Sequence, residues 1–380
     1  CFFEVSWQTL QALPEPGAAV PSPSSAACDD PDKAKRWLVL GAQAVDIAEG
    51  IRQELEIGTD SIIASEVGDL ERCWKDNYFS TVLLCADSQQ KPLEGLSEAL
   101  QVMKRSVLQE RENTRSIEVW FLMDRSRSVT PGDLQGAPIP NQAGLWGLAR
   151  AAHLECPSMR VGCFDYMQPS SVEGAGVIPK VLGRFFASAA CSGTDQRSGG
   201  ETEVAARWTT ESAVTNGEKR HGELFGARLL EKSEMQGVQM PEAFFKDYGA
   251  CVITGGLGSL GVYLARWLAD HGVKSLALLG RSGKPQPDVA STLEALSSSS
   301  SPCIAVRACD VSSAEALKSC CDELGRTLPP ISGIFHAAGT LDDHAVGNLS
   351  VEHLPPVLGP KIDGALHLHA ASASWDVRHF

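Results

Sequence analysis

The stretch CVITGGLGSLGVYLARWLADHG, residues 251–272, constrains the fold more than any other part of this sequence. The apolar residues before its first glycine predict a strand buried on both faces, and the residues after its glycine-rich turn predict a helix. Between them, Gly256, Gly258 and Gly261 have the G-x-G-x-x-G spacing of a dinucleotide-binding turn. Such glycines allow a tight turn, close approach of the pyrophosphate, and close packing of helix on strand, while amides at the helix start face the phosphates.

The end of the next predicted strand, SLALLGR, determines which nicotinamide cofactor the turn would hold. A carboxylate there would bind the ribose 2′-hydroxyl of NADH and repel the 2′-phosphate of NADPH. This sequence has Arg281 and Ser282 at that position instead. Because a guanidinium pairs with phosphate through two hydrogen bonds, the sequence predicts NADPH. The alternative for Arg281 is a solvated arginine in a turn.

Two later strand ends carry residues suited to the same cofactor. Asp310 ends the strand IAVRACD, where its carboxylate would accept a hydrogen bond from the adenine amine, or would be the acidic residue at the start of the following helix, or both. The small residues of HAAG, residues 336–339, would let the backbone approach the ribose. The predicted cofactor-binding residues are Thr254, Gly255, Gly256, Gly258, Ser259, Leu260, Gly261, Arg281, Ser282, Asp310, Val311, His336, Ala337, Ala338 and Gly339.

Strands alternate with helices along most of the chain, which predicts an α/β protein with parallel sheets covered by helices. Residues 1–240 form one α/β unit, predicted to bind no cofactor because the turn after its strand WLVLGAQ lacks the second and third glycines. Residues 241–380 form the first half of a doubly wound, NADPH-binding unit. Strands are predicted at residues 1–10, 37–43, 80–87, 116–123, 160–167, 203–208, 224–230, 250–254, 275–281, 304–310 and 331–339.

Composition excludes several other classes of function. The formal net charge of −14 argues against nonspecific binding to nucleic acid or anionic membranes, and no apolar run reaches the roughly 18 residues of a membrane span. The 12 cysteines are scattered, several within apolar runs, which predicts reduced thiols and a cytoplasmic protein. His367 and His369 have the spacing of a metal pair, but no third ligand clusters nearby in the sequence, so no metal is predicted.

Several motifs together resemble one family. VITGGLGSLG, LLGRSG, ACDV, GIFHAAGTLDD and LGPKIDGALHLH are similar, in order and spacing, to the ketoreductase domain of modular polyketide synthases and animal-type fatty acid synthases, within the short-chain dehydrogenase/reductase superfamily. NQAGLWGLARAAHLECP, with Trp146, Gly147, Arg150 and Glu155, resembles the signature of the family's structural subdomain, a shortened Rossmann-like unit that binds no cofactor. The resemblance covers nearly the whole chain.

The resemblance implies NADPH-dependent reduction of a β-ketoacyl thioester on an acyl carrier protein to a β-hydroxyacyl thioester, beside other synthase domains. In this family a tyrosine protonates the alkoxide, a serine binds the carbonyl oxygen, and a lysine lowers the pKa of the tyrosine and holds the nicotinamide ribose. Lys361 matches that lysine; the alternative is a solvated lysine on a helix. Leu341-Asp342-Asp343 resembles the LDD fingerprint of B-type ketoreductases, so Asp343 would mark a product of D configuration.

The serine and tyrosine of the family are expected beyond Phe380, because Tyr78, Tyr166, Tyr248 and Tyr263 all lie at positions unsuited to a proton donor. The sequence begins without Met and ends at the approach to another strand. We therefore expect a piece of a longer polypeptide, which by itself would be inactive.

Two other functions are left open by the residues. A noncatalytic scaffold domain of a megasynthase would fit a missing serine and tyrosine, but a scaffold needs neither Arg281 nor three turn glycines. A free-standing dehydrogenase acting on a small alcohol would need only one Rossmann unit, which the long first unit argues against. Binding of NADPH separates the reductase from the scaffold, and dependence on a carrier-bound substrate separates the reductase from the dehydrogenase.

Overall fold

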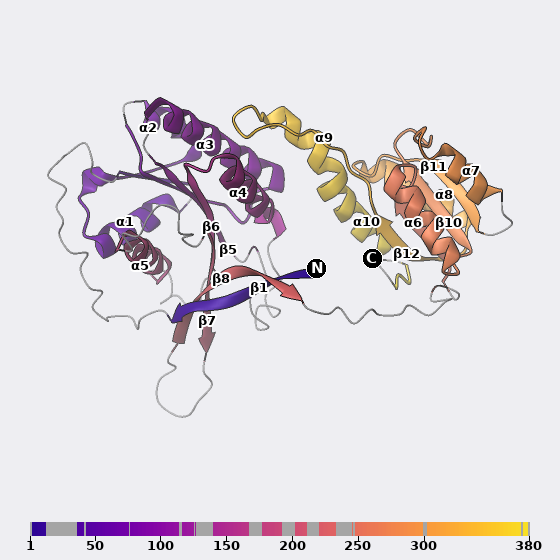
Figure 1. Ribbon diagram of the computed structural model, residues 1–380, viewed down its shortest axis with the longest axis horizontal. Helices are drawn as coiled ribbons and strands as arrows, with labels where there is room; N and C mark the ends of the chain where they lie inside the picture. Colours follow the sequence, from indigo (N-terminus) through magenta and orange to yellow (C-terminus); the bar gives the residue numbers. More distant parts are fainter. Residues whose placement is uncertain are drawn as a thin grey trace. The chain divides into compact units, whose positions relative to one another are not determined.

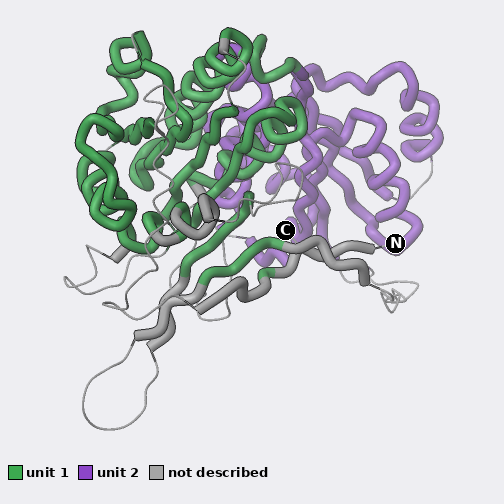
Figure 2. The backbone as a smooth tube through the Cα atoms, turned by 60° about the vertical axis from the view of Figure 1, so that its left-hand side comes forward, with its two compact units in different colours: residues 1–234, 344–349 green, residues 235–343, 350–380 purple. Residues whose placement is uncertain are grey.

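The computed structural model of the protein contains two compact units. One comprises Cys1–Glu234 and His344–Leu349, the other Met235–Asp343 and Ser350–Phe380. Each unit has its own sheet (Figure 1), and Figure 2 colours the two units separately. The structure describes residues 2–12, 36–41, 43–75, 77–113, 116–124, 126, 140–166, 177–191, 202–210, 220–232, 245, 248–298, 302–373 and 375–378.

The sheet of the first unit is mainly parallel. Its central strands are apolar and almost fully buried, as expected of strands covered on both faces. The neighbouring strands β3, β2, β4, β5, β6 and β7 run parallel to one another. Strand β8 pairs antiparallel with both β7 and β1. In order across the sheet the strands are β1 (Phe2–Ala12), β8 (Arg220–Lys232), β7 (Glu203–Thr210), β6 (Arg160–Tyr166), β5 (Glu118–Asp124), β4 (Thr81–Cys85), β2 (Trp37–Leu40) and β3 (Ile62–Ser65).

Helices cover both faces of this sheet. On one face, α1 (Ala44–Leu55) and α5 (Val177–Cys191) enclose an aromatic cluster in which Trp120 contacts Phe185 edge to face, with ring centroids 5.2 Å apart. The opposite face carries α2 (Leu70–Trp74), α3 (Pro92–Asn113) and α4 (Gly144–Glu155) (Figure 1). The unit also has the short 3-10 helices η2 (Thr59–Ser61), η3 (Val67–Asp69) and η5 (Pro140–Gln142).

The sheet of the second unit is entirely parallel. Its order is β11 (Cys303–Ala308), β10 (Ser275–Gly280), β9 (Ala250–Thr254) and β12 (Ile331–His336). Helices α6 (Ser259–Asp270) and α7 (Ala290–Ser297) pack on one face, and α8 (Ala314–Thr327) and α10 (Gly364–Ser372) on the other. The remaining helical turns are η7 (Val351–His353), α9 (Leu354–Leu358) and the π-helix η8 (Gly359–Asp363).

The strand order reverses between β9 and β12. The chain leaves β9 toward β10 and β11 and then returns to the other side of β9, which gives the order 3-2-1-4 of a doubly wound sheet. Ligands of such sheets bind beyond the carboxyl ends of the strands at this switch point. The predicted α/β class with two Rossmann-like units is confirmed, and the predicted glycine turn follows β9 directly.

Several elements lie where the sequence predicted none. Among them are the edge strand β3, the short helix α2 and the helix α5. In α5 the buried side chains of Ile178, Val181, Leu182 and Phe185 follow helical spacing. Among the described residues, no helix has the length and apolarity required to cross a bilayer.

Candidate cofactor and active site

The turn between β9 and α6 is built from glycines because the backbone leaves no room for side chains. Gly255 has a φ of 67°, and a Cβ there would lie 2.4 Å from the carbonyl oxygen of Ala337. A Cβ at Gly256 would lie 2.7 Å from the oxygen of Ile253, and one at Gly261 would lie 2.3 Å from the oxygen of Gly255. These three glycines therefore satisfy packing within the protein itself.

Gly258 differs from the other glycines of the turn. Its backbone is extended (φ −93°, ψ 172°), and a Cβ would meet only the oxygen of Gly255 at 3.5 Å and the side chain of Gln286 at 3.7 Å. The protein alone thus has space for a side chain here. Gly258 also precedes the first residue of α6 and provides no capping side chain. The first amides of α6 are therefore suited to a phosphate group.

The polar side chains near this helix end are partly engaged. The hydroxyl of Ser259 donates a hydrogen bond of 2.7 Å to Asp288. Leu260 is 72% exposed. A phosphate at this position would thus be bound by backbone amides, with the hydroxyl of Ser259 held by a neighbouring carboxylate.

The carboxyl ends of β9 and β12 are joined through the side chain of Thr254. Its hydroxyl lies 2.6 Å from Nδ1 of His336 and accepts a hydrogen bond of 3.3 Å from the amide of Ala338, while its carbonyl accepts the amide of Ala337 at 3.1 Å. Nε2 of His336 is buried, and no hydrogen-bond partner for it lies among the described residues. Gly364 of α10 packs beside this ring, since a Cβ there would lie 3.3 Å from Cε1 of His336. These contacts fix the HAAG segment beside the glycine turn.

A pocket of about 90 Å³ opens at these strand ends. It lies at the position expected for the adenosine side of a dinucleotide, between the glycine turn and the ends of β10, β11 and β12. The lining residues that the sequence predicted are Gly255, Arg281, Asp310, Val311, Ala338 and Gly339. The lining residues that it missed are Leu279, Gly280, Cys309, Thr340 and Pro360.

Most of the missed residues could have been found from their positions. Gly280, Cys309 and Thr340 directly adjoin predicted residues at the same strand ends, and Leu279 lies two positions before Arg281. A hydrogen bond with Cys320, together with burial, raises the pKa of the Cys309 thiol, so this side chain is neutral at the pocket wall. Pro360 comes from η8, and no strand-end pattern points to it.

Two charged side chains at the pocket have different surroundings. Arg281 is exposed, and no ion pair or hydrogen bond of its side chain lies within the described part of the chain. Asp310 accepts the amide of Ser312 through Oδ1 at 3.0 Å. The residue that caps α8 is Ser313, whose hydroxyl accepts the amide of Ala316 at 3.2 Å. Asp310 therefore lies three residues before the residue that caps α8, and its carboxylate makes a turn contact there instead of capping the helix.

Lys361 lies beside the HAAG segment. It is exposed on the π-helix η8, and a Cβ at Gly339 would lie 3.5 Å from its Cε. Single π-helical turns occur frequently at functional sites because they shift the side chains of a helix out of register. Ser282 is also exposed, and its hydroxyl accepts the amide of Lys284 at 3.2 Å.

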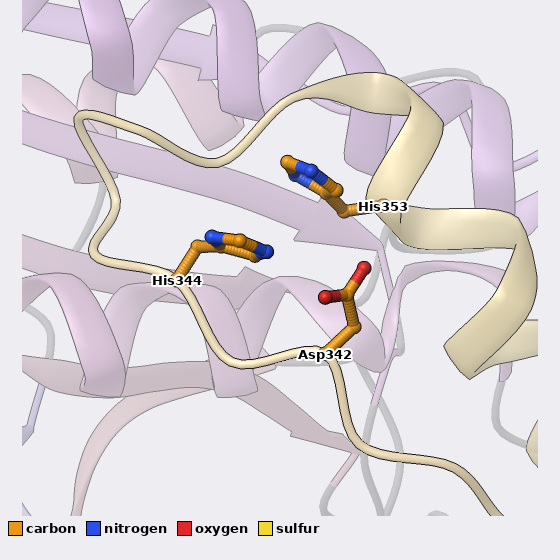
Figure 3. Close-up of side chains that lie close together, drawn as sticks. All are labelled: Asp342, His344 and His353. Carbon is orange, nitrogen blue, oxygen red and sulfur yellow. The ribbon is translucent and has the colours of Figure 1, made fainter.

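Histidines near the site have hydrogen-bonding roles. Nδ1 of His367 lies 3.0 Å from the carbonyl oxygen of Val311, so this nitrogen donates a hydrogen bond. Figure 3 shows a second group, in which ligand atoms of Asp342, His344 and His353 lie within 4.8 Å of one another. Nδ1 of His353 accepts the amide of Ser350 at 3.0 Å, which places the proton of the neutral ring on Nε2. A protonated nitrogen cannot ligate a metal, so we assign no metal to this group.

Asp343 adjoins this group in the sequence. Its side chain is exposed, and so is that of Leu341, two positions earlier, which is 81% exposed. At the start of the same loop, the hydroxyl of Thr340 donates a hydrogen bond of 2.6 Å to the carbonyl of Pro356.

In the first unit, polar residues of α4 connect this helix to other segments. Nε1 of Trp146 donates to the hydroxyl of Ser126 at 2.7 Å, and that hydroxyl donates to the buried carboxylate of Asp165 at 2.7 Å. Arg150 forms two hydrogen bonds with Glu203, of 2.5 and 2.6 Å, which raise the pKa of its guanidinium. These contacts give the α4 signature a structural role within the first unit.

Comparison with known proteins identifies the second unit. Residues 249–380 match the family described as KR domain. The pikromycin polyketide synthase component PikAIII of Streptomyces venezuelae is 30% identical over 239 residues, which are 63% of this chain and 13% of that protein. The polyketide synthase GfsA of Streptomyces halstedii is 31% identical over 255 residues, which are 67% of this chain and 3% of that protein. This chain therefore spans a small part of the length of these relatives.

A solved structure has the same fold. The first ketoreductase of the tylosin PKS is similar with a TM-score of 0.70 and 23% identity, and the match covers 100% of this chain and 71% of that chain. The fold, the sequence relatives and the family match agree with the resemblance found in the sequence. Residues 249–380 of this chain therefore match the KR domain family, and the two relatives in sequence are polyketide synthases.

Proposed function

We propose that this chain is the cofactor-binding part of an NADPH-dependent β-ketoacyl reductase within a polyketide synthase. Its substrate would be a β-ketoacyl thioester on the phosphopantetheine arm of an acyl carrier protein, reduced to a β-hydroxyacyl thioester. Residues 1–240 would be the structural subdomain and residues 241–380 the N-terminal part of the catalytic one. The observation that carries the proposal is the pocket at the switch point, which has Arg281 at the end of β10 where NADH-binding units have a carboxylate.

The residues around the pocket fit NADPH. Amides at the start of α6 would hold the pyrophosphate, and the space at Gly258 would admit it. Arg281 and Ser282 would bind the 2′-phosphate, since both are exposed and the guanidinium has no competing ion pair within the described residues. The free oxygen of Asp310 would accept a hydrogen bond from the adenine amine. NADPH, when bound, supplies the hydride for reduction of the keto carbon.

Lys361 and Asp343 would act on the nicotinamide and substrate side. Lys361, beside Gly339, would hold the nicotinamide ribose and lower the pKa of a tyrosine that protonates the alkoxide. None of the four tyrosines of the chain lines the pocket, and we assign none of them this role. Asp343 would direct the product toward the D configuration of B-type ketoreductases.

The test is binding of NADPH and NADH to Arg281→Ala. Loss of charge-assisted hydrogen bonds costs about 1.5–3 kcal/mol, so we expect the Kd for NADPH to rise roughly 10- to 150-fold. The Kd for NADH should change less than about twofold, because NADH has no 2′-phosphate for the guanidinium to bind. Arg266→Ala, on the exposed side of α6, is the matched control and should leave both values unchanged. Equal effects of Arg281→Ala on the two cofactors would contradict the assignment.

A noncatalytic scaffold domain is the second candidate, which the sequence also left open. The same titration separates the two, because a scaffold would bind neither cofactor. Binding of NADPH with dependence on Arg281 would support the reductase.

A further inference from the structure

The loop that follows Asp343 belongs to the first unit, although the residues on either side of it belong to the second. The segment 344–349 is a closed turn, in which the carbonyl of Ala345 accepts the amides of Asn348 and Leu349 at 2.8 and 2.9 Å. The side chain of Val346 is 3% exposed, whereas Leu341, Asp343 and Ala345 are exposed. Burial therefore holds the loop at Val346.

Glu155 contacts this turn from the end of α4. Its Oε2 accepts the backbone amide of Val346 at 2.7 Å, across 191 positions of the sequence. A hydrogen bond from an amide to a carboxylate is charge-assisted and short. Nearby, a Cβ at Gly347 would lie 3.6 Å from the guanidinium of Arg111 and 3.9 Å from the side chain of Val107. The turn is thus seated against the ends of α3 and α4.

The segment 341–345 is fixed at both of its ends. Before it, the hydroxyl of Thr340 bonds to the carbonyl of Pro356, and after it, Val346 bonds to Glu155. Three residues span at most about 10 Å, so the position of Val346 limits the positions that Asp343 can take. Removal of the carboxylate of Glu155 would release the amide of Val346 and so weaken the hold on the end of this stretch.

We propose that Glu155 is a positioning residue for the loop that carries Leu341-Asp342-Asp343. Through its bond to Val346 it restricts Asp343, and through Asp343 it contributes to the configuration of the product. The second part rests on the proposed function. The first part concerns the chain alone and holds whether or not the protein reduces a ketone.

The first measurement is amide hydrogen exchange in Glu155→Ala, Glu155→Gln and the wild type. Glutamine keeps an acceptor oxygen without the charge, so we expect exchange in residues 344–349 to be roughly tenfold faster in Glu155→Ala and only slightly faster in Glu155→Gln, since a tenfold change corresponds to about 1.4 kcal/mol. Glu112→Ala, which removes an exposed carboxylate near the end of α3, is the control and should match the wild type. Exchange in β4, β5 and β6 should be the same in all of them.

Unchanged exchange in residues 344–349 of a folded Glu155→Ala variant would overturn the proposal, and so would equal acceleration in the alanine and glutamine variants. If Glu155→Ala does not fold, Glu155→Gln decides alone. Its turn must then exchange faster than that of the wild type, with an unchanged rate in the core strands. An unchanged rate in the turn as well would again overturn the proposal.

The second measurement is the ratio of D to L product in the complete natural polypeptide. We expect Glu155→Ala to lower this ratio, Glu155→Gln to restore most of it, and the Kd for NADPH to stay the same. If NADPH does not bind at all but the turn still exchanges faster in Glu155→Ala, the proposed function fails and the positioning of the loop stands. If NADPH binds and the product ratio stays unchanged, the contribution of Glu155 to product configuration is wrong.

Discussion

Each unit contains a similar strand, turn and helix, β2 and α1 in the first and β9 and α6 in the second, yet the two turns are built differently. In the second unit the turn after β9 has four glycines, three of which fit only without a side chain, and the fourth, Gly258, leaves space toward solvent. In the first unit the turn after β2 has a single described glycine, Gly41, and the residue before α1 is Gln43. The side chain of Gln43 accepts a hydrogen bond of 3.2 Å from the hydroxyl of Tyr166.

We propose that a parallel sheet and a helix start are not sufficient for a cofactor site. The second unit differs from the first in that Gly258 provides no side chain at the helix start, beside a pocket whose Arg281 has no ion pair among the described residues. In the first unit, polar side chains lie at the corresponding turn and bond to one another. The proposed division of labour between the units follows from this difference in side chains.

Gly261→Ala is expected to have the largest effect. Its Cβ would lie 2.3 Å from the oxygen of Gly255 and 2.5 Å from Cα of Gly256, and neither backbone atom can move without distorting the turn. We expect the free energy of unfolding of the second unit to fall by about 3 kcal/mol. Urea denaturation, followed by hydrogen exchange in β9 and α6, measures this loss.

Gly258→Ala is the matched variant in the same turn. Its nearest contact would be 3.5 Å, so the free energy of unfolding should change by less than about 1 kcal/mol. The methyl group would occupy the space proposed for the pyrophosphate, and the Kd for NADPH should rise roughly tenfold or more, equivalent to about 1.4 kcal/mol. A large loss of stability with unchanged affinity would mean that Gly258 has the same packing role as its neighbours.

Raising the pH tests both units through a matched pair of buried thiols. Burial raises the pKa of Cys85 in the first unit and of Cys251 in the second from 9.0 to about 12. The unfolded thiols lose their protons above pH 9 while the folded thiols keep theirs up to about pH 12. Stability is therefore full below pH 9 and falls as the pH rises through the interval from 9 to 12.

At pH 10 we expect a loss of roughly 1 kcal/mol for each thiol, in the unit that contains it. Urea denaturation at pH 7, 9 and 10 measures this, with Cys85→Ala and Cys251→Ala as reference variants. Each substitution should reduce the pH dependence of its own unit by that amount and leave that of the other unchanged. A remainder is expected, because the pKa values of Cys156 in the first unit and of Cys309 and Cys321 in the second are also raised. An undiminished pH dependence in both variants would show that other groups cause it.

Tyr166→Phe should have the smallest effect. It removes the hydrogen bond to Gln43 and keeps the ring buried, so we expect the free energy of unfolding of the first unit to fall by about 0.5–1.5 kcal/mol. The Kd for NADPH should stay the same. A weaker affinity for NADPH in this variant would show that the first unit takes part in cofactor binding.

Most residues of the candidate site could be predicted from local sequence motifs, but the long-range contacts that hold them could not. The glycine turn and the strand ends at Arg281, Asp310 and His336 are contiguous motifs whose chemistry is set by neighbours in the chain, which is why they could be predicted. The lining residues Leu279 and Cys309 adjoin those motifs and were within reach of the same argument.

Other features depend on contacts that no local pattern contains. The bond between Glu155 and Val346 spans 191 positions, and the hydrogen bond between Thr254 and His336 depends on the pairing of β9 with β12. Helix α5 was not predicted, and its apolar residues pack on distant parts of the chain, as Phe185 does on Trp120. For the first unit, the structural subdomain remains a prediction from the resemblance to a family.

Hydrogen exchange with and without saturating NADPH tests the central claim most directly. We predict that NADPH protects the amides of residues 254–261, 280–282 and 309–311, and that residues 41–47 at the turn of the first unit exchange at the same rate in both conditions. NADH at the same concentration should protect residues 280–282 less, because it has no phosphate for Arg281. Protection of no residue of the second unit by NADPH, or protection of the turn of the first unit instead, would contradict a cofactor site in the second unit.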